Sequence, residues 1–193
     1  IAWGLAKSGA RIAVLDRTDA ATRASRGNFA LVWVQSKGLG LAPYANWTVR
    51  SSRAWPAFAA EIKQRTGLDV CHENPGGFHL ALSERELSVR AEQLQRLMAQ
   101  PGIEPYETHI LDRTRLERML PRLGPDVVGG SYCPLDGHVN SLRLYRAIYT
   151  GLAAMGAAIL PGHEVSHIAY AGGEFRLTTA GGEIGAGKIV LAA

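Results

Sequence analysis

An acidic residue at the end of a short apolar run is the feature of this sequence with the clearest chemistry. Asp16 follows residues 11–15, which are short and apolar enough to form a buried parallel strand. A carboxylate in that position can accept hydrogen bonds from the ribose hydroxyls of a bound dinucleotide. Arg17 follows it and is suited either to a phosphate or to solvent. A solvated strand-end carboxylate is the alternative interpretation of Asp16, and both stay open at this point.

The histidines and a serine offer rival chemistries. His163 and His167 are four residues apart, which is the spacing of two metal ligands on one face of a helix. Residues 165–170 are predicted to form a strand, however, and in a strand that spacing holds the two side chains farther apart. We therefore predict no metal site. Ser25 lacks the G-x-S-x-G context of a hydrolase nucleophile, so we set that chemistry aside.

Composition excludes several classes of protein. Of the 193 residues, 47% are hydrophobic and 20% are charged, which is typical of a globular chain with a real core. The net charge is +4, but the arginines are scattered, so no nucleic-acid partner is expected. No apolar run is long enough to span a bilayer, and we predict no transmembrane segment. Cys71 and Cys133 form no CxxC motif and favour a reducing, cytoplasmic location, although a disulfide between them stays open.

Hydrophobic periodicity and turn residues predict the elements that must position these residues. Ser83 with Glu86 is a capping-box pair, and Asn140 or Ser141 caps a later helix. We expect residues 11–15 and 188–191 to lie in one parallel sheet. Helices are predicted at residues 1–8, 46–66, 83 to before Pro101, 111–120 and 141–155, and strands at residues 11–15, 77–82, 129–134, 158–160, 165–170, 174–179 and 188–192.

The polar loop after Asp16 runs into an apolar, aromatic stretch, and this combination suits an extended dinucleotide. In "TRASRGNFALVW", hydroxyls and backbone N–H groups can serve a pyrophosphate, and small side chains let the backbone approach a flavin ring. Here the sequence resembles the D-amino-acid oxidase–like family of FAD-dependent oxidoreductases, which includes glycine oxidase. The resemblance extends over essentially the whole chain, through "RIAVLDR", "TRASRGNFALVWVQSKG", "GGFHLALSERE", "GGSYCPLDGHVNSLRLYRAI", "HEVSHI" and "KIVLAA".

The resemblance implies that FAD is the cofactor and assigns contacts to individual residues. Asp16 occupies the ribose-binding position, with Arg17 beside it, and Ala24 and Ser25 fall in the loop that faces the pyrophosphate. The backbone of Val165 matches a contact to the adenine edge. Where the chain passes the flavin, the family often has an Ala-Gly pair, and Phe29 is a departure from it; the residues there are Phe29, Ala30 and Leu31. No catalytic residue is assigned.

The fold implied by the resemblance is α/β: an incomplete Rossmann-like FAD-binding domain interleaved with an α+β substrate domain built on an antiparallel sheet. Residues 1–45 are the first segment of the FAD-binding domain, residues 46–136 the substrate domain, and residues 137–193 the second FAD-binding segment. The family's GxGxxG loop would precede residue 1 and its C-terminal part would follow residue 193. The resemblance thus implies an internal part of a longer flavoenzyme.

The implied reaction is oxidation of the C–N bond of a small-molecule amine, either an amino acid or a secondary amine. Hydride would pass to the flavin and the imine product would hydrolyse. Because some relatives are multi-subunit enzymes, both a homo-oligomer and a hetero-oligomer stay open. Two other functions are also open: a nicotinamide-dependent dehydrogenase, which Asp16 alone would permit, and a non-catalytic, flavoprotein-like subunit. The substrate and the electron acceptor are not determined by the sequence.

Overall fold

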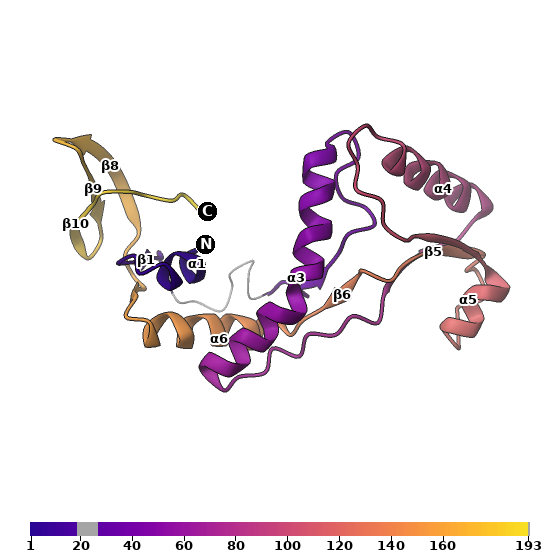
Figure 1. Cartoon of the computed structure of the whole chain (residues 1–193), viewed down its shortest axis with the longest axis horizontal. Coiled ribbons are helices and arrows are strands. Elements are labelled where there is room, and N and C mark those ends of the chain that lie inside the picture. The colour runs from indigo at the N-terminus through magenta and orange to yellow at the C-terminus, as the bar shows by residue number, and fades with distance from the viewer. Residues whose placement is uncertain (19–26, 193) are drawn as a thin grey trace. The chain divides into compact units, whose positions relative to one another are not determined.

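A computed structural model gives the structure of the chain and describes residues 1–18 and 27–192 (Figure 1). The fold is α/β, and contacts divide the chain into two compact units. The first unit consists of Ile1–Asn28 and Tyr145–Ala193, and the second of Phe29–Leu144. These boundaries differ from the predicted 45/46 and 136/137. Residues 31–32 pair with residues 137–138 as short antiparallel strands. Residues 29–45 and 137–144 therefore belong to the same unit.

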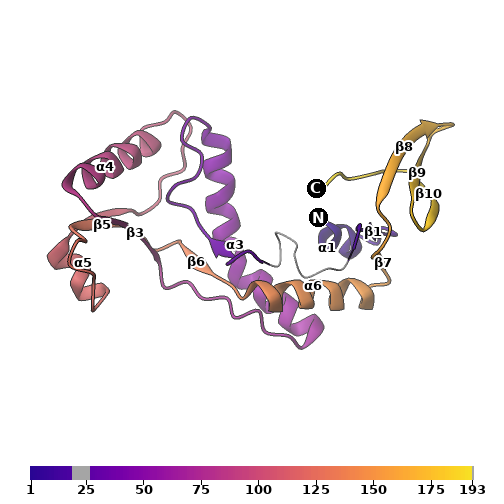
Figure 2. The same ribbon diagram turned by 180° about the vertical axis from the view of Figure 1, so that it is seen from behind.

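The first unit is built on a parallel strand pair and an antiparallel meander (Figure 2). Strand β1 (Ala13–Leu15), which follows helix α1 (Ala2–Lys7), pairs in parallel with β7 (Ala158–Leu160). Helix α6 (Ser141–Ala154) precedes β7, and the boundary between the units falls within it. The meander has the order β10–β9–β8 and consists of β8 (Val165–Ala171), β9 (Glu174–Thr179) and β10 (Gly182–Ala186).

The structure corrects one predicted strand in this unit. Residues 188–192 form no strand, so the prediction that residues 188–191 and 11–15 share a parallel sheet is wrong. A strand forms only where its backbone groups find a partner, and the partner of β1 in the described chain is β7. The turn at Gly181–Gly182 leads instead into β10, which pairs with β9.

The second unit contains a three-stranded antiparallel sheet in the order β3–β5–β4. Its strands are β3 (Gly77–Ala81), β4 (His109–Asp112) and β5 (Gly129–Cys133). A separate short pair joins β2 (Leu31–Val32) to β6 (Gly137–His138). The helices of this unit are α3 (Ala42–Thr66), α4 (Glu84–Met98) and α5 (Arg113–Met119).

Local signals set most of the helix ends. Helix α3 begins at Ala42, earlier than residue 46, because Pro43 is favourable in a first helical turn. It ends at Gly67, whose φ of 71° is left-handed. The Ser83 hydroxyl accepts from the Glu86 N–H at 3.2 Å, which confirms the cap of α4.

The structure corrects one predicted helix start and decides between two predicted caps. Residues 111 and 112 end β4 rather than begin a helix, and Asp112 caps α5 by accepting from the Arg115 N–H at 2.8 Å. Asn140 is the cap of α6, since its side chain accepts from the Arg143 N–H at 2.9 Å. In both places the capping side chain marks the start of the helix.

The two faces of the β3–β5–β4 sheet have different cover. On one face α4 brings Leu87 and Arg90 against β5. Leu87 lies so close to Gly129 of this strand that a side chain at that position would clash. On the other face Leu116 of α5 is fully buried with Leu111 and Val127. Partly buried side chains packed on this second cluster include Phe78 and Tyr132.

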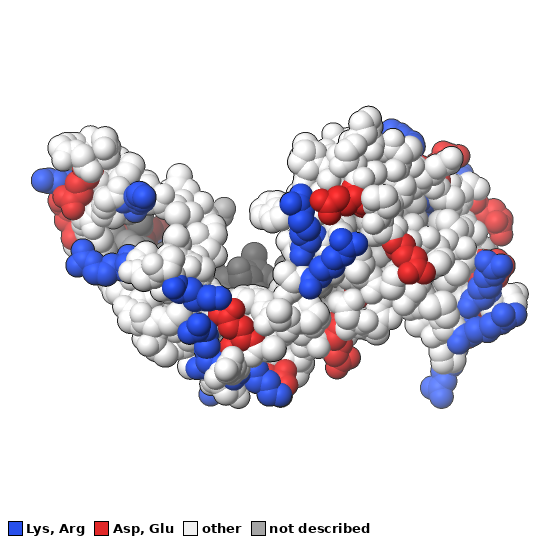
Figure 3. Space-filling model, viewed as in Figure 1, with Lys and Arg blue, Asp and Glu red and all other residues white. Residues whose placement is uncertain are grey.

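The exposed surface agrees with a scattered distribution of charge. Basic and acidic side chains are interspersed on the face drawn in Figure 3. Among the described residues, no helix combines the length and apolar character needed to cross a membrane.

Candidate functional site

The strand end at Asp16 is held by the connection that follows β7. The Asp16 N–H donates to the Leu160 carbonyl at 3.1 Å, and the Asp16 carbonyl accepts from the His163 N–H at 2.9 Å. Arg17 pairs with Glu164 at 3.8 Å, and both side chains are mostly exposed. Because β1 and β7 are parallel, these contacts lie at their shared carboxyl edge, which is where ligands of α/β sheets bind.

Val165 starts β8, directly after the residue that pairs with Arg17. In the described chain β8 is an edge strand of the meander, so one side of its backbone is not paired to another strand. A register shift occurs between Val165 and His167. The structure therefore brings Asp16, Arg17 and Val165 close to one another. A carboxylate, a cation and an open backbone edge fit the adenosine half of a dinucleotide.

Of the remaining predicted site residues, two are not described and three belong to the other unit. Ala24 and Ser25 lie outside the described residues. Phe29, Ala30 and Leu31 belong to the second unit. Phe29 is 77% exposed and Leu31 is 48% exposed, so this segment presents apolar surface that a flat aromatic ring could cover.

Ala30 has a backbone conformation that is uncommon for a residue with a side chain. Its φ is 52°, in the left-handed region. The Ala30 carbonyl accepts from the Val139 N–H at 3.1 Å, next to the β2–β6 pair. The segment is thus held in a defined conformation just before β2.

A buried carboxylate, which the sequence analysis did not single out, bonds to the backbone just after β2. Asp136 is fully buried, and one carboxylate oxygen accepts from the backbone N–H groups of Val34 and Gln35. The other oxygen accepts from the Gln35 side-chain amide at 2.8 Å. The same amide nitrogen donates to the Gly77 carbonyl at 2.9 Å, so both of its donors are satisfied.

The amide oxygen of Gln35 faces a buried cation. It accepts from the Arg90 guanidinium at 2.8 Å and from the Ser131 hydroxyl at 2.6 Å. Arg90 is only 5% exposed and also donates to the Ser131 hydroxyl, the Ser36 hydroxyl and the Gln35 carbonyl. Gln35 therefore links a buried anion to a buried cation, with its amide dipole aligned to both charges.

Burial shifts the acid–base properties of this network. Desolvation raises the pKa of Asp136, while hydrogen bonds from Val34 and Gln35 and the charge of Arg90 oppose that rise. Desolvation likewise lowers the pKa of Arg90. Nearby, burial raises the pKa of the Cys133 thiol to about 12, so this cysteine stays protonated and is suited to packing rather than reaction.

A sequence signal for this network existed but was weak. Gln35 is the first polar side chain after an apolar run, and Arg90 falls on the apolar face of α4. A buried polar side chain needs a hydrogen-bond partner, so a partner is expected for both Gln35 and Arg90. The sequence does not show that the partners are one another.

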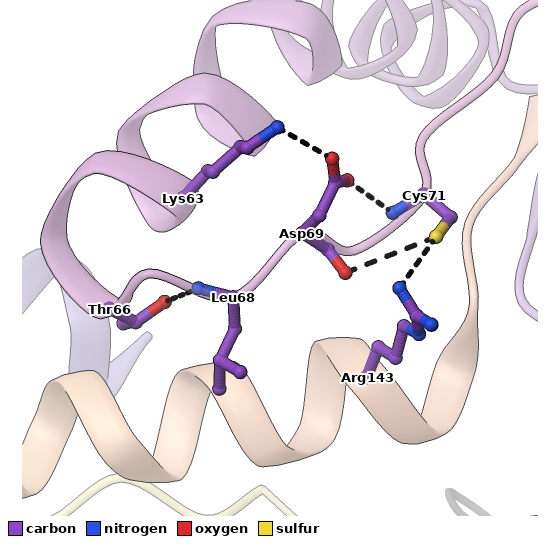
Figure 4. Close-up of polar contacts among 6 residues, drawn as sticks. All are labelled: Lys63, Thr66, Leu68, Asp69, Cys71 and Arg143. Atoms are coloured by element: carbon purple, nitrogen blue, oxygen red, sulfur yellow. Dashed lines mark hydrogen bonds and ion pairs between the residues drawn. The ribbon is translucent and has the colours of Figure 1, made fainter.

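A second group of polar side chains lies where α3 ends (Figure 4). Lys63 and Asp69 pair at 2.8 Å, which raises the pKa of Lys63 and lowers that of Asp69. Asp69 also accepts from the Cys71 N–H at 2.8 Å, and the Arg143 guanidinium donates to the Cys71 sulfur at 3.2 Å. These contacts join the turn after α3 to the start of α6, which is a structural function.

The histidines do not assemble a metal site in the described chain. No group of three or more His, Cys, Asp or Glu side chains among these residues is placed to hold a metal ion. His163 precedes β8 and His167 lies within it, so the two residues do not share a helical turn.

A parallel pair with an acid at its carboxyl edge is an arrangement that occurs in nucleotide-binding α/β proteins. Comparison with known families is more specific, because the DAO family profile, described as FAD dependent oxidoreductase, matches residues 1–193. The chain belongs to this family of FAD-dependent oxidoreductases.

Individual relatives agree with this assignment. An opine oxidase subunit from Agrobacterium tumefaciens (strain Ach5) is 43% identical over 194 residues, which cover 100% of this chain and 52% of that protein. Glycine oxidase of Geobacillus kaustophilus (strain HTA426) is 30% identical over 195 residues, covering 100% of this chain and 50% of that protein. The crystal structure of glycine oxidase from Geobacillus kaustophilus superimposes with a TM-score of 0.84 at 28% identity, over 97% of this chain and 50% of that one. The chain thus spans about half the length of these relatives.

Proposed function

We propose that this chain is part of an FAD-dependent oxidoreductase that oxidises the C–N bond of an amino acid or a secondary amine. The family match over the whole chain carries the proposal. When bound, the flavin supplies an acceptor for the hydride released from the carbon next to nitrogen. The amine becomes an imine, which water then hydrolyses. The chemistry resides in the cofactor, so the residues of this chain bind and orient it.

The proposed roles follow the positions of the residues. Asp16 would accept hydrogen bonds from the ribose hydroxyls, Arg17 would lie beside the adenosine phosphate, and the Val165 backbone would face the adenine. Their proximity at the carboxyl edge of β1 and β7 supports this assignment. Ala24 and Ser25 would face the pyrophosphate.

The remaining assignments are proposals of the same kind. The backbone at Phe29, Ala30 and Leu31 would pass the flavin, which agrees with the exposed apolar side chains of that segment. We assign residues 1–45 and 137–193 to the FAD-binding domain and residues 46–136 to the substrate domain.

The relatives named above suggest a substrate class and an assembly. The Agrobacterium tumefaciens relative is, by its name, one subunit of an opine oxidase. We therefore propose a secondary amine carrying carboxylate groups as the substrate, and a hetero-oligomer as the assembly. Glycine oxidase supports the simpler alternative, a primary amino acid.

The experiment is anaerobic titration of the purified full-length protein, monitored by visible absorbance. A yellow protein whose flavin band bleaches with an opine, but not with glycine, supports the proposed substrate class. If the flavin band bleaches with glycine or sarcosine but not with an opine, the substrate is a simple amino acid instead. A colourless protein that binds no added FAD contradicts the proposal, and binding of NADH by that protein would favour the nicotinamide alternative. Co-purification of a second polypeptide tests the hetero-oligomer.

A further inference from the structure

Residues 136–139 hold the backbone of the segment that begins with the exposed Phe29, through contacts at consecutive positions. Val139 donates to the Ala30 carbonyl, and Gly137 and His138 pair with Val32 and Leu31 in the β6–β2 ladder. At the next position Asp136 has no place in the ladder. Its side chain takes over, accepting from the N–H groups that follow β2.

The carboxylate is needed there because the chain turns away from the ladder before residue 137. The Asp136 N–H bonds back to the Cys133 carbonyl at 3.3 Å, which closes a turn. The neighbouring Gly77 allows this close approach, since a Cβ on Gly77 would lie 2.6 Å from the Asp136 Cβ. Asp136 is therefore packed so tightly that its carboxylate has little freedom to move.

Gln35 and Arg90 then complete the arrangement from the other side. Gln35 receives the Arg90 and Ser131 donors on its oxygen and gives its own donors to Asp136 and Gly77. Rotating the Gln35 amide by half a turn would place its oxygen against the carboxylate and its nitrogen against the guanidinium. Both contacts would be repulsive, so the two buried charges hold the amide in one orientation.

We propose that Asp136 and Gln35 are positioning residues for the flavin, because they hold residues 30–35 in the conformation that presents Ala30 and Leu31 to the cofactor. This inference rests on the proposed function, in which that segment passes the flavin. Neither side chain touches the cofactor in this scheme. They act through the backbone of the segment, whose Ala30 is already held in an uncommon conformation.

The test measures FAD affinity and the flavin absorbance spectrum of the full-length protein. Asp136→Ala removes the carboxylate that holds Val34 and Gln35, and it should raise the Kd for FAD about tenfold and shift the flavin bands. Asp136→Asn keeps an oxygen for the backbone donors but removes the charge, so its effect should be smaller.

Leu116→Ala is the matched control, because Leu116 is fully buried in the same unit but lies on α5 and packs with Leu111 and Val127. It should lower the melting temperature while leaving the Kd for FAD and the flavin bands unchanged. That contrast separates positioning from general destabilisation.

The outcomes also separate this inference from the proposed function. A parent protein that binds no FAD overturns both. A parent that binds FAD, with Asp136→Ala and Asp136→Asn retaining its Kd and spectrum, overturns the positioning inference alone. If Asp136→Ala does not fold, Asp136→Asn and Ser131→Ala decide: a shift in Kd or spectrum supports the inference, and parental values for both reject it.

Discussion

The second unit buries two charged side chains inside the fold, whereas Asp16 and Arg17 of the first unit lie at a strand end. Arg90 and Asp136 are buried and joined through Gln35. Asp16 is only partly buried, and Arg17 is mostly exposed, at the carboxyl edge of β1. Most buried apolar side chains also lie in the second unit, while the first unit contributes Trp3, Ala147, Leu152 and Leu177.

The difference separates two uses of a charge. A buried charge must have its partners inside the protein, because leaving it unpaired costs several kcal/mol (about 3–5). A charge at a partly exposed strand end can take up a ligand at lower cost. Mutations in the second unit should therefore affect stability first, and mutations at the strand end should affect cofactor binding first.

The largest effect is expected for Arg90→Met. The change removes the cation that faces Gln35 and Ser131 and leaves the Asp136 carboxyl without its counter-charge. The free energy of unfolding should fall by about 3–5 kcal/mol. Urea unfolding of the full-length protein measures it. Arg96→Met, at an exposed position of the same helix, should change it by less than about 0.5 kcal/mol. Equal stability of the Arg90 variant and the parent would contradict the contrast between the units.

The next effect concerns the cofactor rather than the fold. Asp16→Ala should weaken FAD binding by about 1.5–3 kcal/mol, or about 10- to 150-fold in Kd, because a charged acceptor is lost. Thermal stability should remain near that of the parent. Titration of the apoprotein with FAD checks the affinity. Glu183→Ala, at an exposed position of β10 in the same unit, serves as the control and should bind FAD normally. Unchanged affinity in the Asp16 variant would refute its proposed role.

A smaller effect on stability is expected for Gly77→Ala. An added Cβ would lie 2.6 Å from both the Asp136 Cβ and a ring carbon of Trp33, so the surroundings must shift. The cost should be about 1–3 kcal/mol. At Gly124 a Cβ would meet no atom within 4 Å, and Gly124→Ala should cost less than about 0.5 kcal/mol. Similar melting temperatures for the two variants would show that the region around Asp136 is less tightly packed than the structure indicates.

The smallest effect is a pH dependence of stability in the second unit. Burial lowers the pKa of His72 and of His79 below 6.5, so the unfolded chain binds protons before the folded one. The stability present above pH 6.5 is therefore lost as the pH falls through the folded pKa values. Melting temperatures across this range should decline, and combining His72→Gln with His79→Gln should flatten the decline.

Asp136 has the opposite sign and provides the contrast. Its raised pKa means that the folded protein takes up this proton first as the pH falls toward 3.8. Its contribution to stability is therefore greatest at low pH and is lost as the pH rises through its folded pKa. Asp136→Asn should remove this contribution to the pH dependence of stability. A parallel pH profile for this variant and the parent would argue against a titrating carboxyl at this position.

The sequence by itself determined the features that depend on neighbouring residues. Gly67 ends α3, Ser83 caps α4, and Asp16 follows a short apolar strand. Each is set by a backbone preference or a hydrogen bond that spans only a few residues, and the same is true of the quoted motifs that carry the family resemblance. Such signals can be recognised without knowing what the rest of the chain does.

Only the tertiary structure decided which distant residues meet. Gln35 bonds to Asp136 across 101 positions of sequence and to Arg90 across 55, and no local pattern encodes either partnership. The same reason explains residues 188–192, whose apolar composition suits a strand that found no partner in the described chain. A cap is satisfied within its own turn, whereas a buried charge or an isolated strand depends on backbone and side chains brought from elsewhere by folding.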